Sequence, residues 1–268
     1  MPALSVRPLV STVALLTALA FPGVAVAQRA GGGGPAAPAP PARTVAPKDL
    51  TGTWVSVVAE HWHLRMLVPP KGEFAMLPLN AEARRIAGAW DPAKEPPGDA
   101  QCKGYGAAAI MRIPGRLHIA WTDDNTLRMD IDSGTQTRVF HFGGTAPTNQ
   151  AATWQGYSTA EWEGIPVAEL RRRTAGSGED VRGGLRVITT RLRPGYLRKN
   201  GVPYSENTRV EEHFDRFTEP NGDDWLVVDS IVTDPTYLTA PYITSVAFKK
   251  IPDRQGWDPT PCRAAEAR

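Results

Sequence analysis

The chain has 268 residues, of which 41% are hydrophobic and 22% are charged. A chain of this length and composition can bury a large core, so we exclude a disordered protein, a collagen-like protein and a small disulfide-rich domain. Its 30 lysine and arginine residues nearly balance 28 aspartate and glutamate residues. With so little net charge, the sequence predicts no basic surface for nucleic acid.

The first residues have the pattern of an export signal. Arg7 precedes an apolar stretch over residues 9–20, and residues 25–27 have the A-x-A pattern of a cleavage site. Pro22 interrupts the apolar run, which makes an uncleaved membrane anchor the weaker alternative. We therefore expect residues 1–27 to be a signal peptide.

Alanine, proline and glycine dominate residues 28–47. Such a segment has little to bury, so it is predicted to be a linker. Residues 48–268 then form one domain. No later stretch is long and apolar enough to cross a bilayer, so we expect a periplasmic or secreted protein with no stable membrane span after signal cleavage.

The two cysteines are predicted to form a disulfide. Cys102 and Cys262 are the only cysteines of the chain, and an oxidising compartment would let one bridge persist. The bridge would close a long loop and contribute about 3–5 kcal/mol in the chain-entropy description. Neither cysteine lies in a Cys-x-x-Cys pair or beside a histidine, so a metal or nucleophile role is the weaker interpretation.

Short runs with strand-like patterning, separated by turn residues, fill the chain from residue 49 onward. The strands are expected at residues 53–59, 62–68, 107–113, 116–121, 126–132, 135–142, 155–162, 185–192, 207–217, 225–233 and 242–249. One helix is predicted over Asn80–Trp90, with Asn80 at its N-cap. Tight connections exclude parallel β-α-β units, so we expect an all-β fold, an antiparallel barrel or sandwich with one short helix.

Three short motifs lie along the predicted domain. A Gly-x-Trp start occupies residues 52–54, a Trp-x-Gly-x-Ser…Trp-Glu-Gly pattern residues 154–164, and an Asp-Pro…Thr-x-Pro pattern residues 234–241. Together they resemble a family of secreted bacterial lipocalin-like β-barrel proteins, and the likeness covers most of residues 49–262. The resemblance implies an exported lipocalin-like barrel. The activity of this family is not settled, so the resemblance implies no catalytic residues.

Such a barrel is expected to bind a small, partly apolar molecule in its mouth, with aromatic side chains as walls. The candidate ligand-binding residues are Trp54, Trp62, Trp121, Trp162, Tyr196, Arg198, Tyr204 and Trp225. The hairpin over residues 193–207 either forms the lip of a pocket that holds an anionic ligand, or is an exposed turn whose aromatic residues fold down as a cover. The sequence indicates no cofactor.

A secreted hydrolase, lyase or isomerase is the alternative, with acid and base residues in the barrel cavity. Polar residues among apolar neighbours in the predicted strands are the candidates, because burial shifts pKa values and is costly without a partner. They are His141, Glu212, His213 and Asp229. Asp229 lies between aliphatic residues, so we expect it to be partnered. Structural hydrogen bonding or exposure of all four stays open, as does a third hypothesis, an envelope interaction protein without a small ligand.

His61 and His63 are the most metal-like pair. Alternate residues of a strand share a face, so two imidazoles there can meet one zinc or copper ion. The same alternation places them opposite Trp62, Leu64 and Met66, which are the better core candidates. Two solvent-facing histidines are therefore the preferred interpretation, and we predict no metal.

Overall fold

The computed structural model describes residues 40–164 and 183–266. The predicted signal peptide and the first part of the predicted linker, residues 1–39, lie outside the described residues. The described residues belong to one compact unit, Pro40–Arg268. No helix within the described ranges is long and apolar enough to cross a membrane.

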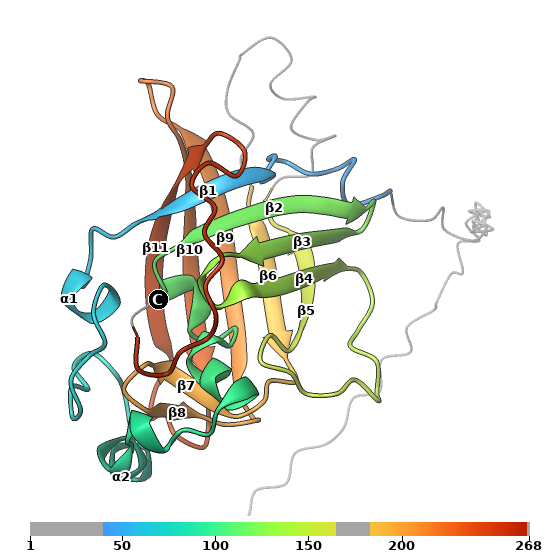
Figure 1. Ribbon diagram of the computed structural model, residues 1–268. Helices are drawn as coiled ribbons and strands as arrows, with labels where there is room; N and C mark the ends of the chain where they lie inside the picture. The colour runs from blue at the N-terminus through green and yellow to red at the C-terminus, as the bar shows by residue number, and fades with distance from the viewer. Residues whose placement is uncertain (1–39, 165–182, 267–268) are drawn as a thin grey trace, which may run out of the picture. The chain divides into compact units, whose positions relative to one another are not determined.

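Nine strands close into a barrel in the order β1-β11-β10-β9-β6-β5-β4-β3-β2 (Figure 1). They are β1 (Gly52–Val57), β2 (Arg116–Asp123), β3 (Thr126–Ile131), β4 (Gln136–Phe142), β5 (Tyr157–Trp162), β6 (Leu185–Thr190), β9 (Arg209–Thr218), β10 (Asp224–Thr233) and β11 (Tyr242–Ile251). β1 closes the barrel, because Trp54 pairs with Lys250 of β11 and with Leu117 of β2. The predicted all-β barrel is confirmed, although one neighbouring pair, β4 and β5, is parallel.

Alternation along the strands decides which side chains fill the barrel. Leu117 and Ile119 of β2 are buried, as are Leu127, Met129 and Ile131 of β3, so every second residue of these strands points inward. Large aromatic side chains complete the interior: Trp54, Phe140, Phe214 and Phe248. Burial of each such side chain contributes about 1.5–3 kcal/mol. The interior is therefore a packed core rather than an open lumen.

A second apolar cluster lies at one end of the barrel, where Figure 1 places α2 (Ala81–Ala89) and the two-stranded sheet of β7 (Gly195–Arg198) and β8 (Val202–Tyr204). α2 is the predicted helix. The Asn80 side chain accepts a hydrogen bond from the Ala83 backbone N–H at 2.9 Å, as an N-cap should. Ala83 and Ala87, one turn apart, are the positions that α2 buries in this cluster.

Two of the predicted strands are wrong. Residues 62–68 contain α1 (Trp62–Arg65), a single turn, and residues 107–113 lie after η2 (Gly98–Tyr105) and include η3 (Ile110–Arg112). In both segments consecutive residues are buried together, Leu64 with Arg65 and Ile110 with Met111, which a strand with one buried face does not allow. Further 3-10 turns are η1 (Pro92–Lys94) and η4 (Ser133–Thr135), so the fold has more short helices than the one predicted.

Two chain ends of the described unit pack against the barrel. The predicted disulfide between Cys102 and Cys262 is present and joins residues 160 positions apart. The end of the predicted linker also packs: the Ala42 N–H donates to Asn125 at 2.8 Å, and its carbonyl accepts from the Trp162 indole at 2.8 Å. Residues 40–47 are therefore part of the folded unit, because backbone hydrogen bonds hold even a segment with little apolar surface.

Candidate functional site

A small pocket lies between α1, η3 and β7. Its charged lining residues are Arg65, Arg112, Arg198 and Lys199, and aliphatic side chains such as Leu67 complete the wall. Among the described residues no carboxylate lines this pocket. Its volume is about 30 Å³, which suits a single oxyanion group rather than a drug-sized molecule. We refer to it as the arginine pocket.

Arg65 reaches the arginine pocket because the single turn of α1 directs it inward next to Leu64. Its Nε donates to the Arg112 carbonyl at 3.0 Å, and its Nη1 pairs with Glu60. Its Nη2 is buried and has no hydrogen-bond partner in the described ranges. Burial lowers the pKa of Arg65, and the positive charge of Arg112 lowers it further, although Glu60 opposes both effects.

Arg112 and Arg198 come to the same pocket from η3 and β7. The Arg112 guanidinium makes no hydrogen bond or ion pair within the described part of the chain, and burial together with repulsion by Arg198 lowers its pKa. The Nη2 of Arg198 donates to the Ala75 carbonyl at 2.8 Å, whereas its Nε and Nη1 are buried without a partner among the described residues. Three guanidinium nitrogens of Arg65 and Arg198 are therefore unsatisfied within that part of the chain, which is costly for buried polar groups.

Lys199 differs from the three arginines because its donors are satisfied. Its Nζ donates to the Tyr105 hydroxyl at 2.5 Å and to the Glu266 carbonyl at 2.6 Å, and it lies 3.8 Å from the Tyr105 ring centroid. Burial lowers the pKa of Lys199 to about 7. Near neutral pH, Lys199 therefore adds only part of a positive charge to the pocket, and the arginines remain its main cations.

The tryptophans proposed as ligand walls do not surround one open space. Trp54 is fully buried in the core, where its indole donates to the Leu50 carbonyl at 3.0 Å. Trp121 and Trp162 meet at a ring distance of 6.3 Å, in a cluster completed by Phe142. Trp62 is exposed on α1, and Trp225 is half-buried with an indole N–H that has no partner in the part of the chain that the structure describes.

The hairpin of β7 and β8 contributes both to a pocket and to packing. Arg198 lines the arginine pocket. Tyr196 instead packs edge-on against Trp90 at 5.9 Å and donates to Glu95, and burial raises its pKa. Tyr204 is buried in the apolar cluster, and burial also raises its pKa. Arg198 and Lys199 of the hairpin thus line the pocket, whereas Tyr196 packs on Trp90 and Tyr204 lies in the apolar cluster.

The four acid and base candidates lie on both sides of the barrel wall. Glu212 is buried inside, whereas its neighbour His213 points to the outer face. His141 is half-buried and stacks on Tyr157 at a ring distance of 4.6 Å. Asp229 is exposed, and no hydrogen bond or ion pair joins its carboxylate to another described residue, so the partner expected for it from the sequence is not found. Some of the apolar residues beside Asp229 point outward and are only half-buried. The outer face of β10 is therefore apolar without being buried, which the sequence pattern alone does not distinguish from a second buried face.

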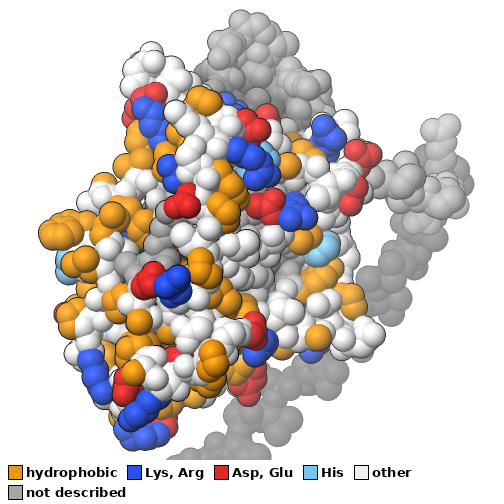
Figure 2. Space-filling view, viewed as in Figure 1, with side chains coloured by type: hydrophobic (Ala, Val, Ile, Leu, Met, Phe, Trp, Pro, Cys, Tyr) orange, Lys and Arg blue, Asp and Glu red, His pale blue; other side chains and the backbone are white. Residues whose placement is uncertain are grey.

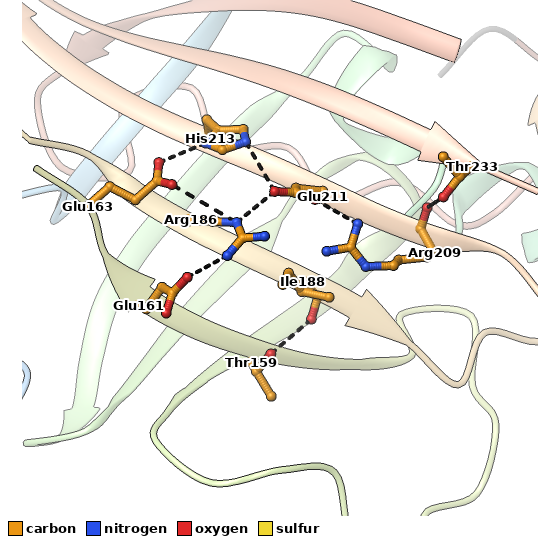
Figure 3. A network of polar contacts seen from close by, with 9 residues as sticks. All are labelled: Thr159, Glu161, Glu163, Arg186, Ile188, Arg209, Glu211, His213 and Thr233. Atoms are coloured by element: carbon orange, nitrogen blue, oxygen red, sulfur yellow. Dashed lines mark hydrogen bonds and ion pairs between the residues drawn. The ribbon is translucent and has the colours of Figure 1, made fainter. Parts of the chain in front are cut away.

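Ion pairs surround His213 on the outer face of β5, β6 and β9 (Figure 3). Its Nδ1 lies 2.8 Å from Glu163 and its Nε2 lies 3.5 Å from Glu211. Arg186 contacts Glu211 at 2.6 Å, and hydrogen bonds from Arg186 and Arg209 lower the pKa of Glu211 to about 2. The carboxylates of Glu161, Glu163 and Glu211 are paired with Arg186, Arg209 and His213, so contacts within the chain account for these residues without a ligand.

The two histidines proposed as weak metal candidates flank Trp62. His61 precedes α1 and His63 lies within it, so they do not share the strand face that the sequence suggested. The His63 ring contacts Trp62 edge-on at 5.8 Å. In the described ranges no group of three or more histidine, cysteine, aspartate or glutamate residues is placed to hold a metal ion.

Sequence reasoning missed two cations of the pocket and one inside the barrel. Arg65 and Arg112 carry no local signal, because they are 47 positions apart and meet only in the folded chain. Arg138 is buried inside the barrel and pairs with Glu212. Its signal was available, since Arg138 lies two residues before Phe140 and therefore shares its inward face.

Comparisons of the chain with protein-family models, with curated proteins and with solved structures found no match. The functional argument therefore depends on the geometry of this chain alone.

Proposed function

We propose that this protein is exported and binds a small, partly apolar molecule through an anionic group held in the arginine pocket. One observation carries the proposal: Arg65, Arg112 and Arg198 line one small pocket that no carboxylate lines among the described residues. An oxyanion in this pocket would reduce the repulsion between the three positive charges and would accept hydrogen bonds from the Arg112 guanidinium, which makes none within the described part of the chain.

The pocket also limits the kind of ligand. A volume of about 30 Å³ leaves room for one small anionic group inside the pocket and places the rest of the ligand outside it. Leu64, Leu67 and Ile113 lie in the same lining, so the part of the ligand next to the anionic group would meet aliphatic surface. The site is not in the barrel interior, because side chains fill that interior and no residue of the nine barrel strands lines the arginine pocket.

Export is supported by two independent features. The first 27 residues have the order of a signal peptide, with Arg7 before an apolar stretch and small residues at the end. The disulfide between Cys102 and Cys262 is of a kind that persists in oxidising compartments. Both features fit a periplasmic or secreted protein.

Calorimetric titration of the purified protein with inorganic phosphate, sulfate and acetate tests the binding proposal. We expect at least one of these anions to bind, and Arg112→Gln to weaken its affinity by about tenfold or more, because a hydrogen bond to a charged group contributes about 1.5–3 kcal/mol. Arg85→Gln, which removes an exposed arginine from α2, is the matched control and should bind like wild type. The proposal is refuted when no anion binds wild type, or when Arg112→Gln retains wild-type affinity.

A further inference from the structure

Large apolar side chains are exposed on α1 and the two residues after it. Trp62, Met66 and Leu67 have exposed fractions of 61%, 51% and 59%. Figure 2 shows hydrophobic side chains and a histidine at the left edge of the molecule, where Figure 1 places α1. Single exposed hydrophobic residues are common, but three large ones within six positions indicate an interaction surface.

The geometry of α1 separates this apolar surface from the cations. Trp62 and Met66 lie four positions apart, and the Met66 backbone N–H donates to the Trp62 carbonyl at 2.7 Å, so their side chains share the outer face of the turn. Leu64 and Arg65 are buried on the opposite face. Leu67 is both exposed and part of the pocket lining. Leu67 therefore stands at the rim of the arginine pocket, and Trp62 and Met66 lie on the outer face of the adjoining turn.

A neighbouring groove extends the same surface. It has a volume of about 680 Å³, and Met76 and Ile243, exposed by 63% and 65%, are among its lining residues. Ala75 also lines the groove, and its carbonyl accepts a hydrogen bond from Arg198 of the arginine pocket at 2.8 Å, which places the groove next to that pocket. Apolar side chains thus flank the cations on more than one side.

We propose that this face binds the surface of a bilayer that contains anionic phospholipid. This inference depends on the proposed anion site: the phosphate of a lipid headgroup would occupy the arginine pocket, and Trp62, Met66 and Leu67 would enter the interface around it. Tryptophan prefers the bilayer interface, and basic residues near an anionic bilayer contribute about 1 kcal/mol each.

Charge complementarity favours a lipid over a free anion. A free phosphate satisfies the guanidinium donors of Arg112 and Arg198 but offers nothing to the exposed apolar rim. In a bilayer, the lipid phosphates lie at the depth of the headgroups and the acyl chains lie immediately below them. Around α1, cationic side chains likewise lie next to exposed apolar ones. Two weak contributions of this kind, one electrostatic and one apolar, are what reversible interfacial binding requires.

Co-sedimentation with lipid vesicles tests the inference. Vesicles of phosphatidylglycerol should bind the purified protein, and vesicles of phosphatidylcholine should bind it much more weakly. The triple variant Trp62→Ser/Met66→Ser/Leu67→Ser should lose at least about tenfold in affinity for phosphatidylglycerol vesicles and keep wild-type affinity for inorganic phosphate. Arg112→Gln should lose both, and Phe217→Ser, which removes an exposed aromatic residue from β9, should lose neither.

The outcomes separate this inference from the function on which it depends. Phosphate binding without binding to phosphatidylglycerol vesicles overturns the lipid inference alone and leaves a free anion as the ligand. Absence of binding to both overturns the proposed function as well. Equal binding to phosphatidylcholine, or unchanged vesicle binding of the triple variant, also overturns the lipid inference. So does concentration-dependent self-association that the triple variant abolishes, because the face would then bind a second copy of the chain.

Discussion

Replacement of Glu212 by leucine should destabilise the protein far more than replacement of Glu212 and Arg138 together. The two side chains are fully buried inside the barrel, and Arg138 donates to Glu212 at 2.8 and 2.5 Å. The guanidinium carbon lies 5.1 Å from the Phe140 ring centroid. In Glu212→Leu the positive charge of Arg138 stays in this apolar interior without a counter-charge, which costs about 3–5 kcal/mol.

The double variant Arg138→Met/Glu212→Leu removes both charges and fills a similar volume. The Thr189 hydroxyl loses its contact with Arg138 at 3.2 Å but keeps its hydrogen bond to Ser158 at 2.7 Å, so the change leaves no newly unpaired group on this residue. We therefore expect the free energy of unfolding of the double variant to lie within about 1–2 kcal/mol of wild type. The total stability of a domain is only about 5–15 kcal/mol, so the two outcomes differ clearly.

Equilibrium urea unfolding at neutral pH with the disulfide intact measures both quantities in a double-mutant cycle. We expect a coupling energy of at least about 3 kcal/mol for the buried pair. The pair Arg128 and Asp130 of β3, half-exposed at the arginine, is the control and should couple by less than about 1 kcal/mol. If Glu212→Leu costs less than about 1 kcal/mol, or the double variant is as unstable as the sum of the singles, the reasoning on the desolvated pair is refuted.

Two further predictions concern stability. Because the pKa of Lys199 is lowered to about 7 in the folded protein, the unfolded chain binds more protons between about pH 7 and pH 10. Unfolding free energy should therefore rise with pH across this window in wild type, and Lys199→Met should lose that part of the rise; urea unfolding at several pH values measures it, and an unchanged slope would contradict the pKa. Cys102→Ala should lower the free energy of unfolding by about 3–5 kcal/mol, because its bridge to Cys262 closes a loop over 160 positions; a melting temperature equal to wild type would contradict this.

Local patterns in the sequence were sufficient for most of the barrel. Alternation and turn residues located the nine barrel strands, and the inward positions of β2, such as Leu117 and Ile119, followed from the period of two. The two cysteines allowed only one intramolecular bridge. Asn80 marked the start of α2 because its side chain satisfies a free backbone N–H locally. Each of these features depends on residues close in sequence or on simple counting.

Patterning failed where the local period did not determine burial. Asp229 lies on β10 among aliphatic residues on both faces, and only the folded barrel shows that its own face is the exposed one. Apolar and polar residues alternate from His61 to Val68, which is typical of a strand. The residues around Leu64 nevertheless form a helical turn, which buries two consecutive side chains. Hydrophobicity alone decides neither the exposed face of β10 nor the conformation of the segment around Leu64. Apolar residues lie on both faces of β10, and the spacing of apolar residues around Leu64 fits a strand as well as a helical turn.

The arginine pocket was decided by tertiary structure. Arg198 was a candidate from the sequence, because it lies in a hairpin with aromatic residues, but its two partners were not. Arg65 comes from α1 and Arg112 from η3, 47 positions later, and each has ordinary neighbours in the sequence. Their convergence creates burial, mutual repulsion and unsatisfied donors at once. These properties belong to distances between side chains rather than to the residues themselves, so only the folded chain establishes them.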